Sequence, residues 1–169
     1  MAELHQSIVT RLQGDATLTG SGAAQLGFGV YDRWLTPGPG PGSTPSAFDQ
    51  AAGGRLKRSI VVLDGGETRN PALGRQGTFI WDSAPVVYLF AEAHANGKAA
   101  VEAADRRVEA LLLGWGLVLT SGERVTFARD SRVGLEDAQQ FPGNVVTVVR
   151  YRATGARIVP DVSAWTVNP

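Results

Sequence analysis

The chain has 169 residues, no cysteine, and 16 basic against 16 acidic side chains. This length can bury a core without disulfides or metal, and the absence of cysteine excludes a disulfide framework or a thiolate metal site. Zero formal net charge gives no strong field toward nucleic acid or a membrane.

The N-terminal segment predicts a short amphipathic helix over residues 3–13. Its apolar side chains recur at helical spacing and Gly14 follows as a stop signal. The first six residues lack the basic start and apolar run of a secretory signal, and no stretch approaches the ~20 apolar residues of a membrane helix. We expect a protein made in the cytoplasm, with no membrane partner.

Residues 15–54 predict connectors around one weak strand. Residues 15–22 are rich in turn formers, and residues 27–34 alternate as a strand weakened by two glycines. Residues 36–54 form a long Pro/Gly loop, and connections of this length are functional or disordered. Its only large apolar residue is Phe48, which either attaches the loop to the domain or anchors a partner.

The central part of the chain predicts two buried strands. Residues 59–63 form the first, and a turn follows at Asp64-Gly65-Gly66. Residues 78–91 form a longer strand, in which Pro85 predicts a bulge or an edge position because it cannot donate to a ladder. Apolar residues on both faces after Pro85 predict a central strand covered on both sides.

Residues 98–113 predict the main helix, with Asn96 as its cap and Gly114 as its end. The apolar stripe consists of Val101, Ala104, Val108, Leu111 and Leu112. The charged residues lie mostly off this stripe: Glu102, Asp105, Arg106, Arg107 and Glu109. We expect the stripe to pack on the strand near Val87 and Leu89.

Strands are predicted over residues 117–119, 124–129 and 145–152, with a protruding hairpin loop at residues 130–143. The tail, residues 154–169, is apolar for a chain end. Its large apolar residues are Ile158, Val159, Val162, Trp165 and Val167. This arm either docks on a neighbouring subunit or folds back on its own domain.

These elements predict an α+β fold, with two helices packed on a mixed, mostly antiparallel sheet. We expect one domain over residues 2–153, which includes the loop at 36–54, and a C-terminal arm over residues 154–169.

No pattern of catalytic residues stands out. His5 and His94 are the only imidazoles, and no nucleophile elbow frames any serine. The run at residues 38–42 has proline where a phosphate cradle needs N–H donors. We expect no catalytic, cofactor-binding or metal-binding residues and no cofactor, although the scattered carboxylates leave a glycosidase-like pair open. Those carboxylates are Asp64, Glu67, Asp82 and Glu92.

Arg150 and Arg152 lie on one face of the last predicted strand, and Arg129 is on a neighbouring strand. Tyr151 points to the opposite face, so the aromatic interleaving of an RNA-binding sheet is missing. The pattern indicates a solvated sheet edge or a subunit contact.

The order of these elements resembles the tail-terminator and minor-tail-component family of long-tailed bacteriophages. The resemblance covers most of residues 2–153. It is carried by the helix Leu4-His5-Gln6-Ser7-Ile8-Val9-Thr10-Arg11-Leu12, the following Asp15-Ala16, the strands Val30-Tyr31-Asp32 and Ile60-Val61-Val62-Leu63, the strand at 86–91, the helix at 101–113 and the final Arg150-Tyr151-Arg152. The long Pro/Gly loop and the Trp-bearing arm depart from the family pattern.

The resemblance implies a structural virion protein of the tail or neck. Such a protein forms a homohexameric ring at the head-proximal end of the tail tube, ends tube growth and joins the tail to head-completion or stopper proteins. DNA would pass through the lumen without sequence-specific binding. The candidate partner contacts are Phe48, Ile158, Val162 and Trp165. The alternatives are another neck or tail-completion adaptor, a small hydrolase, and a monomeric binding domain.

Overall fold

The computed structural model describes residues 2–35, 47–49, 55–70, 78–93, 96–136 and 143–158. In these residues the chain forms three helices, one large mixed sheet and one small two-stranded sheet, which confirms the predicted α+β class. No helix of the described residues is long and apolar enough to cross a membrane.

The large sheet is almost entirely antiparallel. Its strands are β1 (Gly29–Tyr31), β4 (Ser59–Leu63), β5 (Glu67–Asn70), β6 (Thr78–Ser83), β7 (Val86–Glu92), β8 (Leu117–Val118), β9 (Arg124–Glu136) and β10 (Asn144–Ile158). The order is β1-β4-β7-β10-β6-β5, with β9 on the other side of β10 and β8 on β9. Among the described strands, only β1 runs parallel to its neighbour, β4. The small sheet pairs β2 (Phe48–Asp49) with β3 (Arg55–Leu56).

Strand β10 is the central strand of the large sheet and pairs with three others. Its first half pairs with β7, its second half pairs with β6, and β9 follows it along the opposite side. Strands β6 and β7 therefore lie end to end along β10. On their outer sides, β5 pairs with β6 and β4 pairs with β7. The sequence predicted one long strand with a bulge or edge position at Pro85. The chain instead breaks at Ala84–Pro85, where the Tyr151 N–H donates to the Pro85 carbonyl at 3.0 Å.

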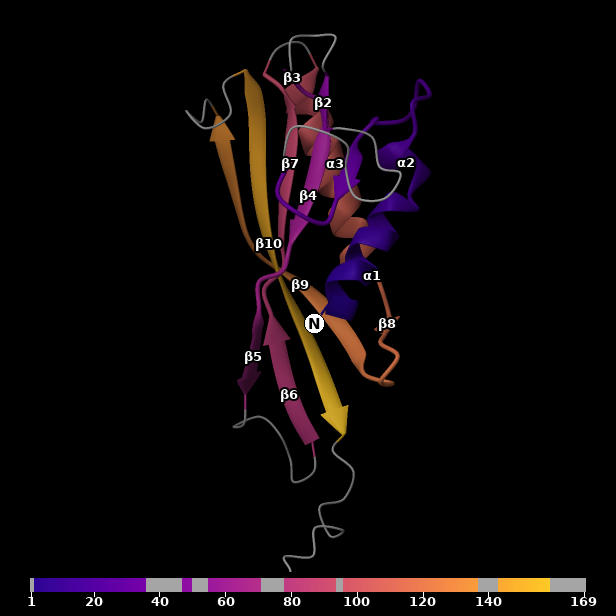
Figure 1. Ribbon diagram of the computed structural model, residues 1–169, viewed down its shortest axis with the longest axis vertical. Coiled ribbons are helices and arrows are strands. Elements are labelled where there is room, and N and C mark those ends of the chain that lie inside the picture. Colours follow the sequence, from indigo (N-terminus) through magenta and orange to yellow (C-terminus); the bar gives the residue numbers. More distant parts are fainter. Residues whose placement is uncertain are drawn as a thin grey trace, which may run out of the picture.

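Helices cover one face of one half of this sheet (Figure 1). Helix α1 (Ala2–Gln13) and helix α3 (Gly97–Leu113) pack there, and the short α2 (Ala16–Thr19) follows α1. Their apolar stripes meet the inward side chains of β7, β9 and β10 in the main core. Beyond the helices, β5, β6 and the end of β10 project as the lower part of the molecule in Figure 1.

Several boundaries differ from the sequence prediction, and the strands β3 and β5 were not predicted. The connector at 15–22 contains α2, which begins because the Leu18 N–H donates to the Asp15 carboxylate at 3.0 Å. The loop at 36–54 includes β2, and Ala47 before it is buried. Strand β9 continues through Glu136, into the predicted hairpin loop. Strand β10 continues through Ile158, so any free arm starts at residue 159.

Trp81 and Gly155 fix the packing where the sheet leaves the helices. The two residues are direct partners across β6 and β10. A Cβ on Gly155 would lie 2.2 Å from the Trp81 ring, so the indole lies on the bare glycine backbone. The indole Nε1 donates to the buried carboxylate of Glu123 at 2.8 Å.

Candidate interaction surfaces

The structure gives only partial positions for the four predicted contact residues. Phe48 begins β2 and Ile158 ends β10, and their side chains lie outside the described part of the chain. Val162 and Trp165 lie entirely outside the described residues. The candidate surfaces below therefore consist of other residues.

The sheet face away from the helices carries an apolar row across five strands. The register places Val133, Val148, Tyr88, Val61 and Tyr31 directly opposite one another on β9, β10, β7, β4 and β1. Directly opposed residues of a sheet share one face. Their neighbours along each strand, such as Leu89 and Val149, point into the helix-covered core.

Burial changes along this row. Val61 and Tyr31 are buried in a second apolar cluster, whereas Tyr88 and Val148 are half-buried and Val133 is 52% exposed. Trp34 is 43% exposed and packs edge-on against Tyr88, with ring centroids 5.1 Å apart. We call Trp34, Tyr88, Val133 and Val148 the open-face patch. Such exposed apolar groups are typical of protein contact sites.

The sequence did not predict this patch. Its pattern favoured a strand after Pro85 that is covered on both sides and a loop that includes Val133. β7 is indeed central, but its face away from the helices is only partly covered. The alternation of side chains along residues 86–92 places Tyr88 and Leu89 on opposite faces of the sheet. Only the strand register shows that Tyr88 lies in the same row as Val133.

A shallow groove of about 460 Å³ runs along the outer side of α1. Its walls are Glu3, Gln6, Ser7, Thr10, Arg11 and Trp115. Several of these side chains already have internal partners. The Arg11 guanidinium lies 5.1 Å from the Trp115 ring centre, and the Glu3 carboxylate accepts from the Thr120 N–H at 2.5 Å and the Thr120 hydroxyl at 2.8 Å. The groove is therefore chiefly the contact region between α1 and the loop after α3.

A carboxylate that is almost buried ties α3 to β9. Asp105 is 4% exposed and accepts from Arg129 at 2.7 Å and from Arg132 at 2.8 Å. Arg129 also donates to Glu109 at 2.9 Å. The prediction that Asp105 lies mostly off the buried stripe is wrong, because its partners come from the sheet and not from the helix.

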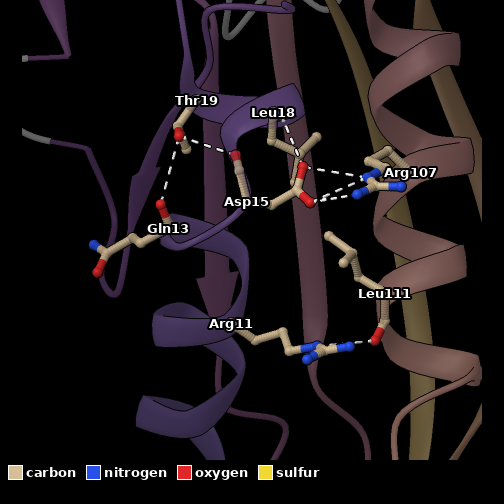
Figure 2. Close-up of polar contacts among 7 residues, drawn as sticks. All are labelled: Arg11, Gln13, Asp15, Leu18, Thr19, Arg107 and Leu111. Carbon is tan, nitrogen blue, oxygen red and sulfur yellow. Dashed lines mark hydrogen bonds and ion pairs between the residues drawn. The ribbon is translucent and has the colours of Figure 1, made fainter.

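A second ion pair joins α2 to α3 (Figure 2). Asp15 receives the Arg107 guanidinium, with the closest contact at 2.6 Å, while it also caps α2. These hydrogen bonds from Arg107, together with the one from the Leu18 N–H, hold the pKa of the Asp15 carboxyl below its ordinary 3.8, although burial opposes the effect. One turn of α1 earlier, Arg11 donates to the Leu111 carbonyl at 3.4 Å (Figure 2).

Two titratable side chains of the described residues, His5 and Tyr151, lie in different surroundings. The His5 Nε2 donates to the Asp32 carbonyl at 3.0 Å, and His94 lies outside the described residues. Burial, with the nearby Asp105 charge, raises the pKa of the Tyr151 phenol well above its ordinary value. No group of three or more His, Asp or Glu side chains in the described ranges is placed to hold a metal ion.

Arg150 and Arg152 are exposed on the open face of β10, as their predicted position on one strand face implies. Arg152 lies 3.7 Å from the Asp130 carboxylate. Arg129 points to the other face, into the Asp105 cluster, so these three arginines do not form one basic surface.

No protein-family model matches the sequence, and a comparison with curated proteins finds no match either. Among solved structures, the chain matches one chain of a structure described as the virion of a native gene transfer agent (GTA) particle. The two chains are 21% identical and superimpose with a TM-score of 0.60, over 92% of this chain and 96% of the other. A second solved structure matches at 11% identity, with a TM-score of 0.49, over 95% of this chain and 94% of the other. The first likeness establishes a shared fold and no more.

Proposed function

We propose that this protein is a structural component of a phage-like virion. In this proposal it forms a ring, a hexamer, at the head-proximal end of the tail tube. The ring ends growth of the tube and joins the tail to the head-completion or stopper protein, while DNA passes through its lumen. The protein would be made in the host cytoplasm and reside in the tail or neck of the particle.

The observation that carries the proposal is the fold shared over nearly the full length of both chains with a protein of the GTA virion. The resemblance of the element order to the tail-terminator family points in the same direction. The description of the matched structure names the particle and not the position of its chains, so another neck or tail-completion adaptor is the second candidate.

The surfaces described above support a protein that works through contacts between subunits. The open-face patch exposes aromatic and aliphatic side chains on one face of the sheet. The projecting end of β5, β6 and β10 extends past the helices, where it can reach a neighbour (Figure 1). A ring needs two different contact surfaces on each subunit, since head-to-tail contacts close a ring only when each surface meets its complement.

The test is to mix the purified protein with isolated tail tubes and with tubes still assembling. A tail terminator should bind one end of each tube and stop its growth at a fixed length. A neck adaptor of the second kind should leave tube growth unchanged and bind only tails that are already closed. A protein that binds neither kind of tube contradicts both candidates.

A further inference from the structure

The described residues leave the open-face patch partly exposed, and the chain carries an apolar segment that has the composition to cover it. Val133 and Trp34 are the most exposed members of the patch, and both lie near the end of the sheet where β10 begins. Residues 159–169 follow β10 and include Val159, Val162, Trp165 and Val167. The question is whether this segment covers its own patch or that of another copy.

The length of the segment answers this question. Val148 and Ile158 are ten residues apart on β10, which places the patch about 33 Å from the end of the strand at about 3.3 Å per residue. Trp165 is only seven residues beyond Ile158. A reversal of direction uses at least two of these, and the remaining five span about 17 Å when fully extended. The backbone at Trp165 would therefore end about 16 Å short of the patch of its own chain, which favours the patch of another copy.

Charge provides a second reason to pair the segment with the patch. Arg150 is exposed and lies two residues from Val148 on the same face of β10. Residues 159–169 carry a single charged side chain, the carboxylate of Asp161. Asp161 and Trp165 are four residues apart, about 13 Å in extended chain, and Arg150 lies two residues along β10 from Val148, the register partner of Tyr88.

From these observations we infer that residues 159–169 of one copy dock on the open-face patch of a second copy, with Trp165 against Trp34 and Tyr88 and with Asp161 beside Arg150. This contact rests on the proposed function in that it requires more than one copy. Because the segment and the patch are different surfaces, the contact is head-to-tail and passes from copy to copy around a closed ring. A buried tryptophan is the usual anchor of such an interface.

The absence of cysteine from these 169 residues allows a direct test by disulfide cross-linking. Two single variants, Val133→Cys and Thr166→Cys, are purified with tags of different mass, mixed at high concentration and oxidised. We expect a disulfide-linked heterodimer as the main product. The matched control is Val118→Cys, which is 55% exposed on β8, away from the patch. It should give at least tenfold less cross-link with Thr166→Cys.

The inference is overturned if Thr166→Cys cross-links equally well to Val133→Cys and to Val118→Cys. It is also overturned if Thr166→Cys does not cross-link to Val133→Cys at all. A chain that carries both Val133→Cys and Thr166→Cys adds a second criterion. It should form covalent oligomers, and exclusive formation of an internally linked monomer shows that the segment folds back, which also overturns the inference.

Charge exchange tests the Arg150–Asp161 pairing. Arg150→Glu and Asp161→Arg should each lower the cross-link yield several-fold, and the variant with both changes should restore it. Failure of the double variant to recover contradicts this pairing. The outcome is separable from the proposed function. If electron micrographs show rings but the cross-link does not form, only this contact is contradicted. If the cross-link forms but no rings are seen, the proposed ring is contradicted.

Discussion

Arg129 and Asp105 face each other between β9 and α3, with one guanidinium nitrogen 2.7 Å from both carboxylate oxygens. Arg132, three residues further along β9, reaches the same carboxylate. Residues three apart in a regular strand point to opposite faces. The register shift between Arg129 and Ser131 inserts Asp130 as an extra residue, and this bulge turns both arginines toward the helix.

Replacement of Asp105 should therefore destabilise the fold strongly. Asp105→Asn leaves two guanidinium groups without their shared counter-charge, and removal of one partner of a buried pair costs about 3–5 kcal/mol. We expect about 2–3 kcal/mol, since Arg129 and Arg132 are partly exposed and can regain water. Urea unfolding followed by tryptophan fluorescence measures the change.

The matched control is Asp130→Asn. Asp130 faces Arg152 at 3.7 Å, and both side chains are exposed, so the change should cost less than about 1 kcal/mol. Equal losses for the two variants would mean that the Asp105 cluster is not a special anchor of β9.

The ion pair of Asp15 and Arg107 should make stability depend on pH in acid. The folded pKa of Asp15 lies below its ordinary 3.8, so the stabilisation is complete above that value and is lost as the pH falls through the folded pKa. Asparagine caps a helix about as well as aspartate does. The stability difference between the native chain and Asp15→Asn should thus stay constant from pH 7 to 5 and shrink below about pH 4. A difference that persists unchanged at pH 3 argues against a charged contact.

A charge in the helix stripe should unfold the domain. Val108 is 1% exposed beneath the sheet, and Val108→Asp would bury a carboxylate without a partner at a cost of several kcal/mol. Ala110→Asp adds the same group on the exposed side of α3 and should change stability by about 0.5 kcal/mol or less. Thermal unfolding of the two variants compares them directly, and similar melting temperatures would place the stripe elsewhere.

Gly155→Ala should disturb the packing of Trp81. The new Cβ meets the indole ring at 2.2 Å, and overpacking of this kind costs about 1–3 kcal/mol. Gly134→Ala on the neighbouring strand is the control, because a Cβ there meets nothing within 4 Å. Near-UV circular dichroism should change for Gly155→Ala only, and an unchanged spectrum with unchanged stability refutes the close approach.

Local patterns were sufficient for α1, α3, β4 and the burial of Val108, because each depends on periodicity within one segment. Local patterns failed where the position of a residue depends on a contact with a residue distant in sequence. Asp105 is charged and sits among charged neighbours, so only the bulge in β9 explains why it is buried. The helix α2 is four residues long, too short for a periodic signal.

The open-face patch was beyond sequence reasoning for the same reason. Trp34, Tyr88 and Val133 come from three separate segments, and they come together only through the register of β7, β10 and β9 and the edge-on contact of the Trp34 and Tyr88 rings. The strand after Pro85 was predicted to be central, and it is, but its coverage on each face depends on which other elements pack there.

The measurement that tests the central claim most directly is negative-stain electron microscopy of the purified protein mixed with tail tubes. The account predicts closed sixfold rings that cap one end of each tube, with tubes of uniform length. Tubes that keep growing in the presence of the protein, together with a protein that remains monomeric on them, would contradict it.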